Sequence, residues 1–169
     1  MDSRETYVRH LPSESQLALT TPGLTAGSGK SILRYVAVEV NARDKQGATP
    51  FLKALMNVVN PNVVTVRLLL DHNADPHVRD NYGVTPLHNA VACGRLELVQ
   101  ILLKHDAEAN ARDNQGDTPF LLASRDGNPG VVRLLLDHSA DVHVRDNKGV
   151  TPLRNAAIYG RLEVARILL

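Results

Sequence analysis

The length, composition and charge of the chain favour a helical protein and exclude several functional classes. It has 169 residues, of which 43% are hydrophobic and only 4% aromatic, and its formal net charge is +1. A core of Leu, Val, Ile and Ala favours packing of helix on helix, while near-neutral charge without a basic cluster argues against a nucleic-acid binder. One cysteine cannot form an intrachain disulfide, and no stretch approaches the ~20 apolar residues of a membrane span. We therefore expect a cytoplasmic protein, with a nuclear location as the alternative, and no nucleic-acid or membrane partner.

The N-terminal part of the chain has no regular pattern. Residues 1–30 are rich in Ser, Thr, Pro and Gly, which predicts a flexible segment. Gly27-Ser-Gly-Lys-Ser31 resembles the second half of a phosphate-binding loop, but Leu24 stands where that motif requires its first glycine. A nucleotide site would also need a strand before the loop and a helix after it. Residues 31–43 resemble the segment 101–112 further along the chain, and are predicted to form a degenerate partial repeat.

The rest of the chain repeats itself about every 33 residues. The string Asp-x-x-Gly-x-Thr-Pro-[Leu/Phe] occurs four times, with its glycines at Gly47, Gly83, Gly116 and Gly149. The last two intervals are 33 residues (116 − 83 and 149 − 116), whereas the first is 36 (83 − 47). A fixed period of this length is typical of stacked repeats. The units are 44–79, 80–112, 113–145 and an incomplete 146–169.

The first unit contains the three additional residues. They lie around Asn57 to Pro61, where an Asn-Pro pair could cap a second helix. We therefore expect a longer loop between the two helices of this unit.

The second unit, 80–112, shows why each unit is expected to be a pair of short helices. Thr85 is a hydroxyl N-cap and Pro86 occupies the first helical position, where its missing N–H costs nothing. Apolar residues then recur at helical spacing until Gly94, which can supply the left-handed residue that ends the helix. A second apolar helix and a polar, glycine-containing turn follow. Helices this short are marginal alone in water, so the units are predicted to stack into a one-dimensional solenoid.

The same unit carries a family resemblance. Gly83-x-Thr-Pro-Leu-His-x-Ala90, Gly94, the Ile-Leu-Leu run at 101–103 and Asn110-Ala-Arg-Asp113 together closely resemble the ankyrin repeat. The resemblance covers residues 44–169 and implies an all-α ankyrin-repeat α-solenoid of helix-turn-helix units with projecting β-turn loops. It also implies a non-catalytic scaffold, which binds a protein partner through a concave face formed by the turn tips and the first helices.

Departures from the family pattern concern one histidine. Family members use it to tie down the first helical turn by hydrogen bonds, and it is present here only as His88. The other units carry Leu52, Leu121 and Arg154 in its place. The resemblance therefore implies less firmly fixed helix starts in those three units.

Candidate partner-binding residues are the variable positions of that concave face, carried over one by one. Tyr82 and Tyr159 are the favoured anchors, because exposed aromatic side chains supply a large contact area at small entropic cost. The alternative is that both tyrosines pack on neighbouring units. The set is Asn81, Tyr82, Val84, Ala92, Cys93, Gln115, Asp117, Arg125, Asp126, Lys148, Ile158 and Tyr159, with Lys45, Gln46, Asn114 and Asn147 as further variable turn positions.

No catalytic, cofactor or metal site is predicted. His72, His105 and His138 recur at the repeat spacing, but equivalent positions of stacked helices lie about 8–10 Å apart, too far to share one metal ion. Cys93 and His88 lack the third residue that would orient a nucleophile and its base. The recurring Arg-Asp pairs, of which Arg79-Asp80 is one, are expected to order the turns.

Two further expectations concern the ends of the chain. Ankyrin arrays are often joined to P-loop NTPase domains of the NACHT type, so the alternative function is a fragment of such a protein with residual phosphate contact at residues 27–31. The last unit reaches Leu169 without the polar outer face of a capping repeat. This predicts exposed apolar surface at that end, which would allow end-to-end association.

Overall fold

The computed structural model describes residues 40–56 and 63–169. Several predictions lie outside these residues: the flexible segment 1–30, the motif at 27–31, most of the partial repeat 31–43, and the longer loop around residues 57–61. Within the described part, Asn41 makes the same pair of bonds as Asn110. Each side chain donates to one backbone carbonyl of the following unit (Asn73 or Ser139) and accepts from a backbone N–H two residues beyond it.

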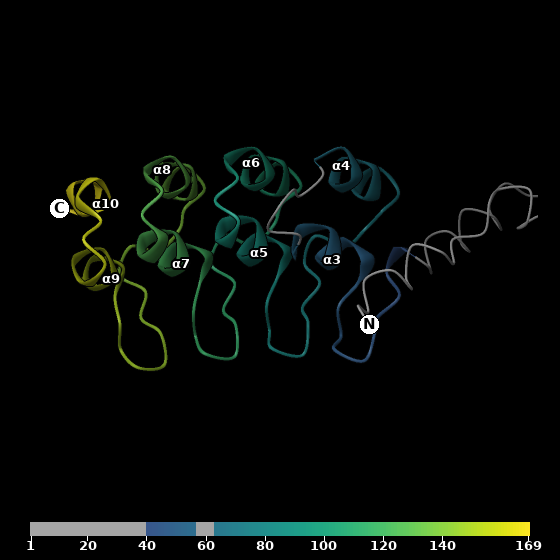
Figure 1. Ribbon diagram of the computed structural model, residues 1–169, viewed down its shortest axis with the longest axis horizontal. Helices are drawn as coiled ribbons and strands as arrows, with labels where there is room; N and C mark the ends of the chain where they lie inside the picture. Colours follow the sequence, from purple (N-terminus) through teal and green to yellow (C-terminus); the bar gives the residue numbers. More distant parts are fainter. Residues whose placement is uncertain (1–39, 57–62) are drawn as a thin grey trace, which may run out of the picture. The chain divides into compact units, whose positions relative to one another are not determined.

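The described residues form helical hairpins arranged in two layers (Figure 1). The inner layer, from which the turns project, comprises α3 (Pro50–Met56), α5 (Pro86–Ala92), α7 (Pro119–Asp126) and α9 (Pro152–Ile158). The outer layer comprises α4 (Val63–Asp71), α6 (Leu96–Lys104), α8 (Pro129–Asp137) and α10 (Leu162–Leu168). No strand occurs in the described residues, and the predicted all-α solenoid is confirmed.

Each inner helix begins at a threonine followed by a proline. The hydroxyl oxygen of Thr118 accepts a hydrogen bond from the backbone N–H of Leu121 at 3.3 Å, and Thr49, Thr85 and Thr151 do the same three residues ahead. Thr85, Thr118 and Thr151 have extended backbones, as an N-cap requires. The predicted start of these helices is therefore confirmed.

Three of the inner helices, α5, α7 and α9, end within two residues of a glycine. Gly94, Gly127 and Gly160 all have positive φ, of 63°, 83° and 64°. In this left-handed region a Cβ would approach the following carbonyl oxygen and cost roughly 1–2 kcal/mol. The glycine therefore lets the chain reverse within a few residues and begin the outer helix.

The core is shared between neighbouring repeats. Phe51, Leu87 and Phe120 occupy the same second position of successive inner helices, and none of them is exposed to solvent. Leu102 and Leu135 are fully buried at equivalent positions of two outer helices. Burying each such side chain stabilises the fold by roughly 1.5–3 kcal/mol. Because this burial needs a neighbouring hairpin, the stack folds as one array.

The Arg-Asp pairs order the turns, but the two residues act separately. Asp80 Oδ1 accepts from the N–H groups of Tyr82 (2.8 Å) and Val84 (2.9 Å), and this closes its own turn. Arg79 instead reaches forward and donates to the carbonyl of Arg112, one repeat later, at 2.7 Å. Arg43 and Arg112 repeat this forward bond. The aspartate therefore shapes one turn, while the arginine joins it to the next.

Asparagines join the turns in the opposite direction. The side chain of Asn114 donates to the carbonyl of Asn81 at 3.0 Å, and its backbone N–H donates to the carbonyl of Tyr82 at 2.9 Å. Asn81 and Asn147 make the same two bonds to their own preceding turns. We call this set of bonds between successive turns the turn ladder. It uses main-chain acceptors throughout.

Candidate functional site

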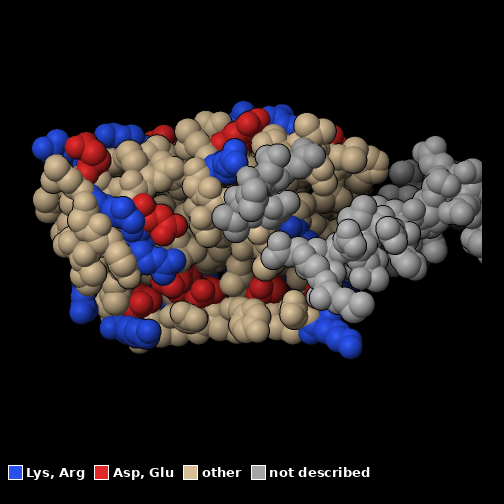
Figure 2. Space-filling model, in the orientation of Figure 1, with Lys and Arg blue, Asp and Glu red and all other residues tan. Residues whose placement is uncertain are grey.

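The candidate site is the surface formed by the turn tips and by the exposed sides and ends of the inner helices, which we call the inner face. A hollow runs between the row of turns and the body of helices above it, and acidic side chains gather along it (Figure 2). Three large hydrophobic candidates on this face are exposed for half or more of their surface: Tyr82 (66%), Ile158 (62%) and Tyr159 (50%). Both tyrosines therefore present half or more of their surface to solvent.

The seventh position of each inner helix contributes to this face. Ala92 and Ile158 are exposed and Arg125 is partly exposed there. Met56 occupies the equivalent position in α3 and is also exposed. Met56 was not among the candidates predicted from the sequence, although the alignment of Pro50 with the later helix-starting prolines identifies its position.

Candidates on the turns divide into two kinds. Tyr82, Gln115 and Lys148 have exposed side chains at the tips, while their backbones belong to the turns. Asn81 has a structural role that the sequence analysis did not anticipate, because its amide donates to the carbonyl of Lys45 at 3.2 Å in the turn ladder. Val84, at the base of its turn, is partly buried.

Asp117, Arg125 and Asp126 form the charged centre of the inner face. Arg125 lies 3.9 Å from the carboxylate of Asp117 and 3.6 Å from that of Asp126. Burial raises the pKa of Asp117, and the negative charges of Asp113 and Asp146 add to this, while Arg125 opposes it. Two other turn carboxylates are therefore close enough to Asp117 for electrostatic repulsion.

Cys93 and His88 each have a separate structural partner. The Cys93 thiol donates to the carbonyl of Leu55 at 3.2 Å, and burial raises the pKa of the thiol. A thiol held in its protonated form is a poor nucleophile. His88 Nδ1 accepts from the N–H of Thr85, so Nε2 donates its proton to the carbonyl of Asp117 at 3.1 Å in the next repeat. The histidine thus fixes a helix start, as the resemblance implied, and also links two repeats.

Two of the three repeated histidines, His72 and His138, bond locally. The Nδ1 atoms of His72 and His138 lie 2.8 and 2.9 Å from the carbonyl oxygens four residues earlier in their own helices. Across residues 40–56 and 63–169, no group of three His, Cys, Asp or Glu side chains is placed to hold a metal ion. None of the helices in that part of the chain has the length and apolar character needed to cross a membrane.

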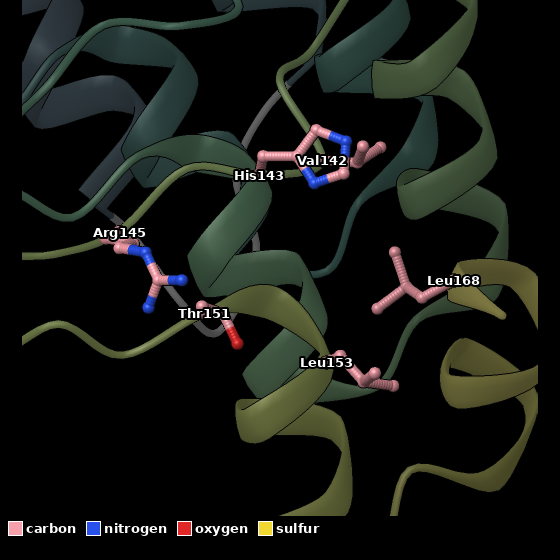
Figure 3. A pocket seen from close by; sticks show the side chains of 6 residues that line it. All are labelled: Val142, His143, Arg145, Thr151, Leu153 and Leu168. Carbon is pink, nitrogen blue, oxygen red and sulfur yellow. The ribbon is translucent and has the colours of Figure 1, made fainter.

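A second surface feature is formed by the end of the third unit and by the fourth unit. Val142, His143, Arg145, Thr151, Leu153 and Leu168 line a hollow of about 260 Å³ there (Figure 3). Leu153 is 39% exposed, although Phe51, Leu87 and Phe120 are fully buried at the equivalent position. Apolar surface is therefore uncovered in this hollow.

The architecture agrees with comparisons to known proteins. A model of ankyrin repeats in many copies matches residues 68–123, and a model of three ankyrin repeats matches residues 107–169. Together the two matches span more than half of the chain. The chain belongs to the ankyrin repeat family. Ankyrin repeats generally mediate protein–protein interaction and are typically non-catalytic.

One relative is similar over part of its length. YahD of Escherichia coli (strain K12), a protein named for its ankyrin repeats, is 40% identical over 65 residues. The similar region is 36% of this chain and 31% of YahD. The chain therefore matches about a third of that relative.

Proposed function

We propose that this ankyrin repeat protein is a non-catalytic scaffold that captures one protein partner on its inner face. The observation that supports this most directly is the exposure of Tyr82, Ile158 and Tyr159 on that face. Aromatic side chains of this kind dominate binding energy at protein interfaces. The turn ladder meanwhile holds the turns without using these side chains. They are therefore available for a partner.

The inner face supports binding better than catalysis. The Cys93 thiol donates to the carbonyl of Leu55. His88 contacts Thr85 and the carbonyl of Asp117, so the two side chains do not pair as nucleophile and base. The acidic groups of the turns close the turns with one oxygen atom each. These polar groups therefore serve the architecture of the repeats.

Mutation of the two tyrosines tests the proposal. The 169-residue chain serves as bait in an extract of the source cells, and captured proteins are quantified by mass spectrometry for three baits. The double variant Tyr82→Ala/Tyr159→Ala is expected to lose the partner, because truncating an aromatic anchor weakens binding at least ~5- to 30-fold. Leu68→Ala, on an exposed apolar side chain of the outer helix α4, is the matched control and is expected to retain it. Equal capture by all three baits would contradict the proposal.

The NACHT-type alternative depends on residues 27–31, which lie outside the described residues. It predicts that the chain binds ATP with Mg²⁺ and that Lys30→Ala abolishes this binding. Isothermal titration calorimetry separates it from the scaffold proposal, which predicts no heat of nucleotide binding.

A further inference from the structure

We propose that the inner face binds an extended, basic protein segment, whose lysine or arginine side chains pair with the turn carboxylates Asp80, Asp113 and Asp146. This inference rests on the proposed function and specifies the chemistry of the partner. Its support is a cation that the chain already places on one turn, the absence of such a cation on the next three, and the regular spacing of the turns.

The first repeat contains an ammonium group bound to its own turn. Lys53, the fourth residue of α3, places Nζ 2.7 Å from Oδ2 of Asp44. Oδ1 of the same carboxylate accepts the N–H groups of Gln46 (2.8 Å) and Ala48 (2.9 Å). The hydrogen bond from Lys53 holds the pKa of Asp44 below its usual value. A turn aspartate can therefore close its turn with one oxygen and bind a cation with the other.

The next three turns have the same carboxylate without an internal cation. Their Oδ1 atoms accept the same two backbone N–H groups. At the position of Lys53, however, the following inner helices carry Asn89, Leu122 and Asn155. Within residues 40–56 and 63–169, Asp80, Asp113 and Asp146 form no ion pair. Their second oxygens are thus open to a cation from a partner.

The surroundings of these carboxylates are acidic. Asp117 and Asp126 lie on the same face, and Arg125 is the cation placed between them. Lys148 is at the tip of the fourth turn, and Lys45 and the already paired Lys53 belong to the first repeat. Arg79 and Arg112 also border the second and third turns, but each donates to a carbonyl of the following turn, and Arg79 pairs with Glu108. Figure 2 shows acidic side chains along the hollow. A basic segment complements this charge, and Tyr82 beside it offers apolar contact.

The repeat spacing favours an extended segment. Stacked helices lie about 8–10 Å apart, and an extended chain rises about 3.3 Å per residue. In an extended polyproline II segment, which has three residues per turn and a rise of about 3.1 Å per residue, every third side chain points the same way. Cationic side chains at that spacing, about 9 Å apart, would meet successive turns.

The experiment uses a displayed library of random dodecapeptides, selected on the full chain. Selected peptides are synthesised, and their Kd is measured for the wild type, Asp80→Asn/Asp113→Asn, Asp71→Asn/Asp137→Asn and Tyr82→Ala/Tyr159→Ala. Asparagine keeps the Oδ1 acceptor that closes the turn and removes only the charge. Asp71 and Asp137 are exposed at the ends of outer helices, so their double variant has the same change of charge away from the inner face. Thermal unfolding verifies that all variants fold.

We expect peptides with lysine or arginine at every third position. The Asp80→Asn/Asp113→Asn variant should bind them about two- to fivefold more weakly per carboxylate, added salt should weaken binding further, and the Asp71→Asn/Asp137→Asn control should bind as the wild type does. Neutral or acidic peptides that depend on the tyrosines would overturn this inference and leave the proposed function standing. The inference would also be overturned if basic peptides bound the Asp80→Asn/Asp113→Asn variant as tightly as they bind the Asp71→Asn/Asp137→Asn control. If no peptide depended on the tyrosines, both proposals would fail.

Discussion

His88 shows how one side chain can serve two repeats. It is almost completely buried, and its two ring nitrogens contact Thr85 in its own repeat and the carbonyl of Asp117 in the next. Nδ1 also lies 2.7 Å from the hydroxyl oxygen of Thr85, and the buried surroundings of the ring disfavour its charged form. Burial accordingly lowers the pKa of His88 below its usual value of 6.5.

Acid should therefore weaken the link between the second and third repeats. The unfolded chain takes up the proton near pH 6.5, whereas the folded chain takes it up only at lower pH, so the free energy of unfolding falls as the pH drops below about 6.5. We expect His88→Leu to lose about 1–2 kcal/mol of stability at pH 7.5 through its missing hydrogen bonds, and to show a weaker dependence on pH between 7.5 and 5.5. Urea unfolding at both values measures this. The exposed His105→Gln is the control, and an unchanged pH dependence in His88→Leu would contradict the assignment.

At the scale of the element, each residue type in the turns makes a different kind of bond, and together these bonds fix the shape of the turns. Aspartate closes each turn, arginine reaches forward and asparagine reaches back. Glycine allows the close approach of neighbouring turns: a Cβ on Gly83 or Gly116 would meet the asparagine of the following turn, whereas a Cβ on Gly149 would meet nothing within 4 Å.

This difference allows two alanine substitutions to be compared. Gly116→Ala and Gly149→Ala both place a side chain at positive φ, of 80° and 76°, which costs roughly 1–2 kcal/mol in each case. Only Gly116→Ala also pushes a methyl group against Asn147 in the next turn. We expect it to lose about 1–3 kcal/mol more than Gly149→Ala, because crowding of a packed contact has a cost of that size. Chemical unfolding gives both values, and equal losses would mean that the turns do not constrain each other.

Sequence patterns predicted the elements better than they predicted the contacts between them. Thr-Pro and the following glycine are local patterns, and they located the inner helices correctly because caps depend on residues close in sequence. The second bond of His88 and the amide of Asn81 join residues 29 and 36 positions apart. Such partners become visible only when the repeats are stacked. The same holds for the candidate site. The sequence alone placed Tyr82 in a turn, but only the structure showed that its side chain is exposed.

For the whole array, stability should vary along the stack. Hairpins within the stack are covered by neighbours on both sides, whereas α9 and α10 are covered on one side by the described residues, and Leu153 and Leu162 remain exposed. In a one-dimensional stack each repeat is stabilised by its nearest neighbours, so local opening should cost less free energy in the fourth repeat than in the third.

Hydrogen exchange measured by mass spectrometry tests this gradient. Amides of α7 and α8 are expected to exchange more slowly than those of α9 and α10. Uniform protection across the four helices would show that the array opens only as a whole.

End-to-end association through the uncovered side of the fourth repeat stays a prediction. Analytical ultracentrifugation of Leu153→Glu beside the wild type tests it, because a charge there should oppose self-association.

The turn ladder has an evolutionary consequence. Its acceptors are main-chain carbonyl groups, including those of Gln46, Tyr82 and Gln115, and every amino acid supplies the same carbonyl. The side chains at these tips can therefore change by mutation without removing a bond that holds the turns together. Natural selection can thus alter which molecule the protein recognises at little cost to its architecture, and the residues best suited to define recognition are also those most free to diverge.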